Sequence, residues 1–333
     1  FEMQEVFELK LNSLEGGRMG HFHADMIQVR QESLIYTITN RLSVTAYSYD
    51  RKEIRKLRTY DLHVDNYVET TDSRAHFAIS HDESSVYVFT IYGAWQIDPK
   101  SILEKVKALG KGYNMDVYDS AVIGENIVLV GPTEGLVIYK VLPDYSLNQF
   151  AKVTEFNGHP LNPVSLAVDE ANGLLYALDQ SRNIYIFTFR DAHIAAHDLI
   201  EIQHVYNFMV RVSGNRLYYS FVDGGNAKIA ELSYDFIEKK ATLIRYYKMF
   251  DYIYDFQVYG EQLVALTQET IEVMPTNIDP RLLTKEHNGV RLLQRARKMA
   301  MIAYEVFVLL NQQSIRIMRM RTLEDRIDCQ FLS

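Results

Sequence analysis

The chain has 333 residues, of which 47% are hydrophobic and 23% are charged, and its formal net charge is −8. This negative charge argues against a general binder of nucleic acids or anionic membranes, which would need clustered Lys and Arg. The single cysteine, Cys329, excludes an intrachain disulfide and a cysteine-based zinc site, and no apolar run is long enough to predict a transmembrane helix.

The first predicted strand covers residues 4–11, where polar Glu8 and Lys10 alternate with apolar Phe7 and Leu9. It precedes the first repeat described below, so we expect it to complete the last repeat and close a ring. Residues 325–332 compete for the same role. The chain starts at Phe1 rather than Met, so it is a processed protein or a fragment, and we favour an exported or organellar location over a cytoplasmic one.

An apolar strand then recurs seven times, each copy following a polar turn and preceding another alternating strand. The copies begin at residues 34, 86, 127, 174, 217, 263 and 306, which are 41 to 52 residues apart. A period in the forties with four short strands per unit indicates a propeller blade. We therefore predict one all-β domain over residues 1–333. Residues 24–333 form a seven-bladed β-propeller of four-stranded antiparallel blades, and residues 1–23 supply the closing strand and a loop.

Within the repeats, four segments have a more specific interpretation. The charged residues 54–62 are predicted to form an outer edge strand, since charge discourages pairing with other sheets. Residues 99–109 form either an outer strand or a helical turn. Residues 191–198 are predicted to be an insertion before an outer strand, and residues 290–296 to be the outer strand of the sixth blade.

Two segments resemble known propeller repeats. Residues 126–139 place an apolar strand, a short Gly-containing turn and Gly135-Leu136 in the order of the LVIVD repeat, and residues 162–176 resemble blades of lactonase-like and WD-repeat propellers. The Trp-Asp signature of WD repeats is absent. The chain is thus similar to the seven-bladed superfamily, with no single family assigned. In lactonase-like propellers, acids and His in the central channel bind a metal or substrate, which implies a hydrolase as one alternative.

Three groups of residues are candidate functional sites. His21, His23 and Asp25 share one face if extended and could ligate a metal, or they are polar residues at the entry to the first inner strand. His193 and His197 would share a helical face, but no Glu follows His193, so the metalloprotease pattern is not met. Acids recur in turns, where they usually cap backbone groups: Asp82, Glu83, Glu125, Asp169, Glu170, Asp223 and Glu261.

The most informative charge cluster lies near the end of the chain. Residues 281–326 contain ten Lys or Arg and four acids, so a basic end accompanies an acidic remainder. We predict an interaction patch for an acidic partner or another copy of the chain, made of Arg291, Arg295, Arg297, Lys298, Arg316, Arg319 and Arg321.

No catalytic residue, cofactor or metal site is predicted, because no nucleophile elbow, phosphate loop or dinucleotide fingerprint occurs. The favoured function is a non-catalytic scaffold for protein interactions, within a larger or self-assembled complex and without nucleic acid. The alternatives are a lactonase-like, metal-dependent hydrolase at the channel mouth and a lectin-like sugar binder that uses exposed Tyr. Fold alone does not decide between them.

Overall fold

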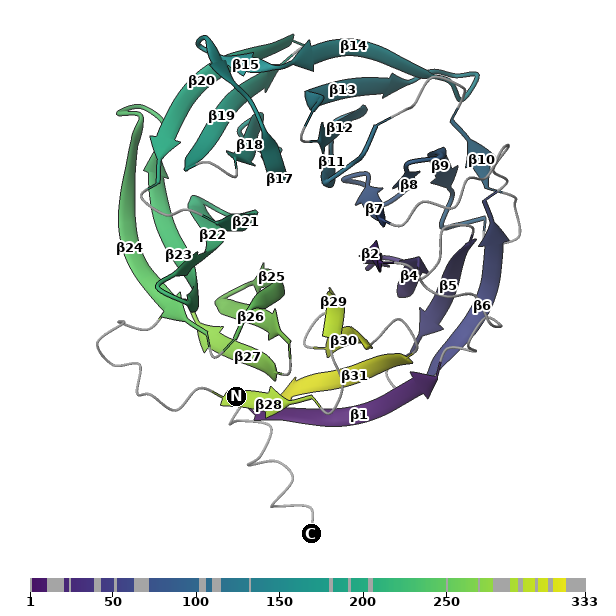
Figure 1. The fold of residues 1–333 in the computed structure, drawn as a ribbon. Helices are drawn as coiled ribbons and strands as arrows, with labels where there is room; N and C mark the ends of the chain where they lie inside the picture. Colours follow the sequence, from purple (N-terminus) through teal and green to yellow (C-terminus); the bar gives the residue numbers. More distant parts are fainter. Residues whose placement is uncertain are drawn as a thin grey trace.

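The computed structural model describes residues 2–10, 21–23, 25–38, 43–50, 53–62, 72–101, 106–109, 115–131, 133–179, 182–190, 193–202, 206–249, 251–268, 270–277, 288–292, 296–302, 305–310 and 314–321. Its strands form small, mainly antiparallel sheets arranged around a central axis, each sheet running from an innermost strand outwards (Figure 1). The prediction of an all-β propeller is confirmed. Among the described residues, no helix is long and apolar enough to cross a membrane.

Three sheets come from the first part of the chain, and each begins with its innermost strand. The first contains β3 (Asp25–Val29), β4 (Leu34–Ile38), β5 (Ser43–Tyr49) and β6 (Ile54–Asp61). The second contains β7 (Asp72–Ile79), β8 (Val86–Thr90), β9 (Gly93–Ile97) and β10 (Lys107–Ala108), with β2 (His21–His23) parallel to β7. The third contains β11 (Asp119–Ile123), β12 (Asn126–Gly131), β13 (Gly135–Val141) and β14 (Leu147–Val153).

The sheets that follow repeat this order. A small hairpin of β15 (Glu155–Phe156) and β16 (His159–Pro160) leads to β17 (Pro163–Asp169), β18 (Leu174–Asp179), β19 (Asn183–Arg190) and β20 (His193–Glu201). The next sheet contains β21 (Asn207–Ser213), β22 (Arg216–Asp223), β23 (Asn226–Asp235) and β24 (Lys240–Lys248). After it come β25 (Ile253–Tyr259), β26 (Gln262–Thr267), β27 (Thr270–Pro275) and β28 (Asn288–Arg291).

The last sheet joins the two ends of the chain. It contains β29 (Ala296–Ile302), β30 (Glu305–Leu310) and β31 (Ser314–Arg321), and its outermost strand is β1 (Glu2–Lys10). β1 pairs antiparallel with β31, from Glu2 opposite Arg321 to Lys10 opposite Ser314. β1 overlaps the first predicted strand, residues 4–11. The competing segment, residues 325–332, and Cys329 lie outside the described residues.

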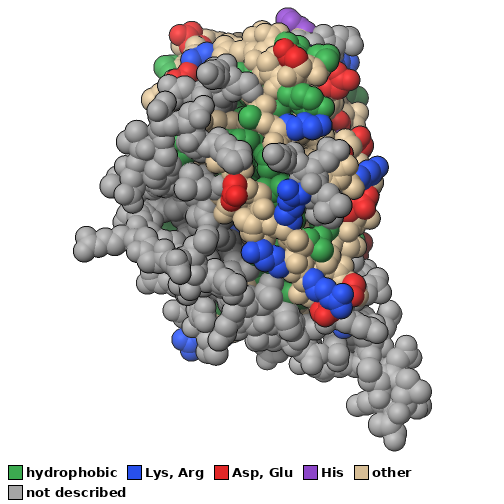
Figure 2. Space-filling model, turned by 90° about the vertical axis from the view of Figure 1, so that its right-hand side faces the viewer, with side chains coloured by type: hydrophobic (Ala, Val, Ile, Leu, Met, Phe, Trp, Pro, Cys, Tyr) green, Lys and Arg blue, Asp and Glu red, His purple; other side chains and the backbone are tan. Residues whose placement is uncertain are grey.

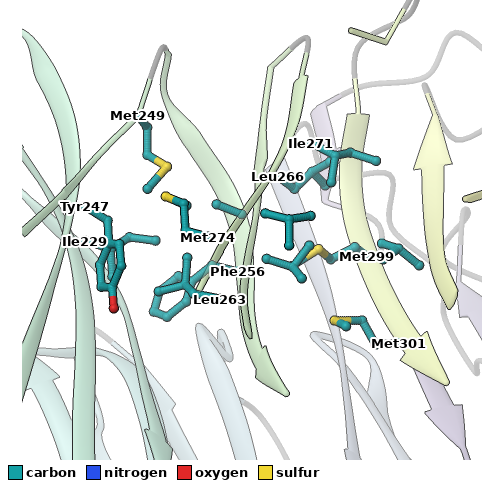
Figure 3. Packing of buried hydrophobic residues seen from close by; sticks show 14 of the residues in the cluster. Ile229, Tyr247, Met249, Phe256, Leu263, Leu266, Ile271, Met274, Met299 and Met301 are labelled. Carbon is teal, nitrogen blue, oxygen red and sulfur yellow. The ribbon is translucent and has the colours of Figure 1, made fainter. Parts of the chain in front are cut away.

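The recurring apolar strand of the sequence is the second strand of each sheet, and each copy starts within one residue of its predicted position. In β4, β8, β12, β18 and β26 every residue is buried. Neighbouring sheets cover both faces of such a strand, so it is continuously apolar instead of alternating. Figure 3 shows both faces of one sheet: Phe256 and Leu263 lie towards Ile229 and Tyr247 of the preceding sheet, whereas Leu266 and Ile271 lie towards Met299 of the following sheet.

Outer strands are polar on the side that faces solvent. In β6, Arg55 and Lys56 are exposed, and the guanidinium of Arg58 lies 5.2 Å from the ring centre of Tyr60. On the side of the ring where β6 and β10 lie, Lys and Arg side chains are interspersed with Asp and Glu (Figure 2). The charged edge predicted for residues 54–62 is therefore present as β6.

Three local predictions are resolved by the strand pairing. Residues 193–198 do not form an insertion, because β20 pairs with β19 from Arg190 opposite His193 to Asn183 opposite Glu201, and residues 191 and 192 lie outside the described part. The outer strand predicted at residues 290–296 is β28, Asn288–Arg291, and β29 already starts at Ala296. Of residues 99–109, Lys107–Ala108 form the strand β10, and residues 102–105 lie outside the described part.

Candidate functional site

One side chain from each innermost strand contributes to a ring of polar groups around the axis, which we call the axial belt: Asp25, His76, Asp119, Ser165, Arg211, Asp255 and Lys298. Six of these residues also line a cavity of about 750 Å³ that opens along the axis. The belt gathers five charged side chains and one histidine around a single cavity, which makes it a candidate site for chemistry.

The three belt aspartates make the same pair of hydrogen bonds. In each, Oδ1 accepts a bond of 2.9 Å from the backbone N–H of the following residue. Oδ2 accepts a bond from a backbone N–H on the innermost strand of the next sheet: Phe77 N–H donates to Asp25 (2.8 Å), Leu166 N–H to Asp119 (2.9 Å) and Met299 N–H to Asp255 (3.3 Å). Each aspartate thus joins two neighbouring sheets near the axis.

Other polar groups link the remaining neighbours. Ser120 Oγ donates to the carbonyl of Phe77, and Ser165 Oγ donates to Asp119 at 2.7 Å while accepting from the N–H of Val210. Between the later sheets the links are ion pairs: Arg211 Nη2 lies 3.4 Å from Asp255, and Lys298 Nζ lies 3.4 Å from Asp25 and 3.7 Å from Asp255. The belt is therefore a continuous chain of hydrogen bonds and ion pairs.

Burial and charge act against each other on the titratable groups of the belt. Burial lowers the pKa of His76, and the nearby Asp25 and Asp119 only partly oppose this, so the imidazole is neutral near pH 7. Burial would raise the pKa of Asp119 and lower that of Lys298. The opposite charges of Arg211 beside Asp119, and of Asp25 and Asp255 beside Lys298, outweigh burial, so the pKa of Asp119 falls and that of Lys298 rises. Both groups stay charged, and the belt carries three negative and two positive charges.

Beyond the belt, the cavity widens between aliphatic walls towards one face of the ring. The walls come from one residue of most innermost strands: Ile27, Ile79, Val122, Val168, Val212 and Val258. At the mouth, the turns between first and second strands supply Arg30, His81, Glu83 and Glu170. His81 Nδ1 lies 2.7 Å from Glu170, which also accepts the N–H of Gly124.

Of the seven turn acids singled out in the sequence, four accept backbone N–H groups, as predicted for turns, and three pair with side chains; Asp169 accepts the N–H of Asn172. Asp82 accepts the N–H of Ser84 within its own turn. Glu83 and Glu170 act across sheets, since they accept the N–H of Gln31 and of Gly124 from neighbouring turns. Glu125 and Asp223 lie on exposed turns and pair with Lys140 and Lys228. Glu261 accepts a bond from Asn277.

The structure places both histidine groups on strands. His21 and His23 lie on β2, whereas Asp25 belongs to β3, where its oxygens are bound by backbone N–H groups. His193 and His197 lie on the strand β20 and not on a helix, because pairing with β19 holds this Ala- and His-rich segment extended. No cluster of three or more His, Cys, Asp or Glu able to hold a metal ion occurs in the part of the chain that the structure describes.

The structure divides the predicted basic patch. Arg291 is exposed at the end of β28, and Arg316, Arg319 and Arg321 lie on β31 beside β1. Lys298 differs from these, because it lies on an innermost strand and its ammonium belongs to the axial belt. Arg297 is on β29, and Arg295 lies outside the described residues. The patch without Lys298 stays a prediction.

Sequence reasoning missed most of the axial belt, including His76, Arg211 and Asp255. A signal was present: each belt residue lies six to ten residues before the start of a recurring apolar strand. An alignment of the repeats on that strand places these polar residues within a window of five positions, although they share no residue type. No protein-family model and no curated protein matches this chain significantly.

Proposed function

We propose that this chain is a non-catalytic scaffold for protein interactions. The observation that carries the proposal is the state of the belt aspartates, whose two oxygens each already accept a backbone N–H bond. Each oxygen keeps a second acceptor position, but Ser165, Arg211 and Lys298 already contact these carboxylates, so a metal or substrate would have to displace them and compete with the backbone bonds. The polar groups at the centre of the molecule thus hold neighbouring sheets together.

We also infer that the ring has seven blades and that residues 1–333 form a single domain. The belt supports this number, since each of its seven members comes from a different innermost strand. The pairing of β1 with β31 supports closure by the N-terminal strand, because a propeller whose ends share a sheet leaves no gap in the ring. The likeness to WD, LVIVD or lactonase-like blades adds no family assignment.

The hydrolase remains the competing proposal, because His76 and Asp119 line the same cavity. A lactonase-like mechanism would use channel acids as metal ligands. In this chain, the Arg211 and Lys298 cations lie beside those acids and disfavour a divalent cation there. The lectin-like alternative would need exposed Tyr around a concave site, whereas neither described cavity is lined by an exposed Tyr.

A metal and activity assay on the purified protein separates the scaffold from the hydrolase. Metal content is measured after dialysis, calorimetric titrations with Ca²⁺, Mn²⁺ and Zn²⁺ follow, and lactone hydrolysis is assayed with each metal. The scaffold proposal expects no stoichiometric metal and no turnover. One metal per chain, together with hydrolysis that is lost in both His76→Gln and Asp119→Asn, would establish the hydrolase instead.

Light scattering over a salt series tests the self-assembly prediction for the basic patch. Assembly through charged surfaces gives a mass above the monomer at low salt that falls as salt is added. A variant with Arg291→Gln and Arg319→Gln should then remain monomeric. A mass that does not change with salt or in this variant rules out assembly through the patch.

A further inference from the structure

The face of the ring at which the cavity opens is strongly acidic. We call it the turn face, defined by the turns between first and second strands at residues 30–33, 80–85, 124–125, 169–173, 214–215 and 260–261. These turns contain seven Asp or Glu and one Lys or Arg, which is Arg30. Hydrogen bonds from Ser80 and Ser84 lower the pKa of Asp82 to about 2, so this acid stays ionised throughout the physiological range. The face therefore attracts cations.

Two cavities meet on the turn face. The axial cavity, about 750 Å³, shares Ser80 and His81 with a second cavity of about 840 Å³. The second cavity continues outwards between the sheets that contain β8 and β12, and it is lined by Asp82, Glu125, Leu142 and Pro143 among others. The two cavities together form a path from the axis outwards, which is lined by acidic, hydroxyl and apolar groups and by Lys140.

The layers of the axial cavity match the two parts of a long basic side chain. Acids at the mouth, Glu83 and Glu170, are followed by the aliphatic walls and then by the belt, which carries one more negative than positive charge. A Lys or Arg side chain has an apolar stem that packs on aliphatic surface and a charged end that prefers acids. An anionic ligand would meet acids at the mouth and a net negative belt.

The length of the path selects among cationic ligands. A small cation would occupy the mouth alone and leave the aliphatic walls and the second cavity without contacts. An extended chain with cations at alternate positions spans both cavities and places apolar residues between its cations. Outside the axis, the exposed Asp82 provides for a cation, and Glu125, which pairs with Lys140, lies nearby.

From these observations we propose that the turn face binds an extended, basic peptide segment, with one Lys or Arg side chain entering the axial cavity. This inference rests on the proposed scaffold function and specifies its partner. The binding is electrostatic at the mouth and hydrophobic at the walls, so it should weaken with salt but persist in part.

Fluorescence anisotropy with a labelled peptide of about ten residues tests the proposal. Its Lys residues alternate with Leu and Ser, and a matched peptide carries Glu in place of Lys. We expect saturable binding of the Lys peptide and none of the Glu peptide. Glu83→Gln with Glu170→Gln removes two charges but keeps the hydrogen-bond acceptors for the turns, and it should weaken binding about tenfold. Glu155→Gln with Glu201→Gln removes two exposed charges outside both cavities and should leave binding unchanged.

A second variant tests the axial cavity itself. Val168 is half-buried on its wall, so Val168→Arg places a cation inside the cavity and should abolish peptide binding. Circular dichroism confirms that each variant is folded. Equal affinity of the folded wild type, the Glu83 and Glu170 double variant and Val168→Arg would overturn the proposal.

Two further measurements distinguish the basic peptide from other ligands of the turn face. A free linear tetraamine that binds as tightly as the peptide would make the ligand a small cation and overturn the peptide assignment. Salt-sensitive self-association that disappears in the Glu83 and Glu170 double variant would identify the occupant as a second copy, which also overturns it. Absence of peptide binding by a metal-free, inactive protein refutes this inference alone, whereas bound metal with hydrolysis refutes the scaffold function.

Discussion

The axial belt and the turn face use the same residue types in opposite environments. Asp25 and Asp255 are 5% and 1% exposed, and backbone N–H groups from two sheets occupy their oxygens. Asp82 and Glu125 are exposed on turns. A buried acid contributes through the bonds it makes, and its removal leaves unpaired donors, whereas an exposed acid contributes mainly a field that acts on ligands. The burial of an acid in this ring therefore distinguishes the acids that stabilise the fold from the acids that attract ligands.

The largest effect should follow from Asp255→Asn. The substitution presents an NH₂ group to a backbone donor and leaves Arg211 and Lys298 without their shared counter-ion. Losing one partner of a buried charge cluster costs about 3–5 kcal/mol of unfolding free energy. Urea denaturation followed by circular dichroism measures it. The exposed Glu238→Gln should change stability by less than about 0.5 kcal/mol, and equal losses in both variants would contradict the comparison.

An intermediate effect is expected for Ser165→Ala. Ser165 is 1% exposed, donates to Asp119 and accepts the N–H of Val210, so the variant leaves a buried backbone donor without its acceptor. The expected loss is about 1–3 kcal/mol in the same denaturation assay. Ser146→Ala serves as the control, because Ser146 is half-exposed on a turn. A loss no greater than that of the control would mean that the link between these sheets adds nothing.

The pH dependence of stability should contain a contribution from His76. Its groups within reach are Asp25, Asp119, Lys298 and Arg74, and its pKa is below the ordinary value because of burial. The unfolded chain takes up the proton near pH 6.5 and the folded chain only at lower pH, so stability falls as pH drops below about 6.5. Denaturation midpoints at several pH values should show a shallower fall in His76→Gln. A slope identical to that of the wild type would mean that groups other than His76 cause the pH dependence of stability.

The smallest effect on stability should be that of Glu83→Gln. Glu83 lies on an exposed turn, and the glutamine carbonyl can still accept the N–H of Gln31. The change should stay within about 0.5 kcal/mol in the denaturation assay. If this variant loses as much stability as Asp255→Asn, the turn acids are structural too, and the distinction between belt and turn face fails.

The sequence predicted the second strands well because they are buried on both faces. Their continuous apolar runs can be recognised without knowing which strands pair with them. It failed for β20, since residues 193–198 have no strand-forming composition and are held extended only by pairing with β19. The belt was missed for a similar reason. His76 and Arg211 lie in separate repeats, and only the arrangement of the sheets in space brings them to the same cavity. Lys298 was predicted to belong to the basic patch with its arginine neighbours, although β29 places it at the axis.

The pairing of β1 with β31 also sets the order of events during synthesis. β1 ends at Lys10 and its partner begins at Ser314, so the two strands leave the ribosome at different times. At typical elongation rates of 5–20 residues per second, β1 is synthesised on the order of 15–60 s before that partner. For this interval its backbone donors and acceptors are available to other chains. Nascent copies on one message are therefore exposed to mispairing through this strand, and a chaperone that shields the N-terminal segment would raise the yield of folded protein.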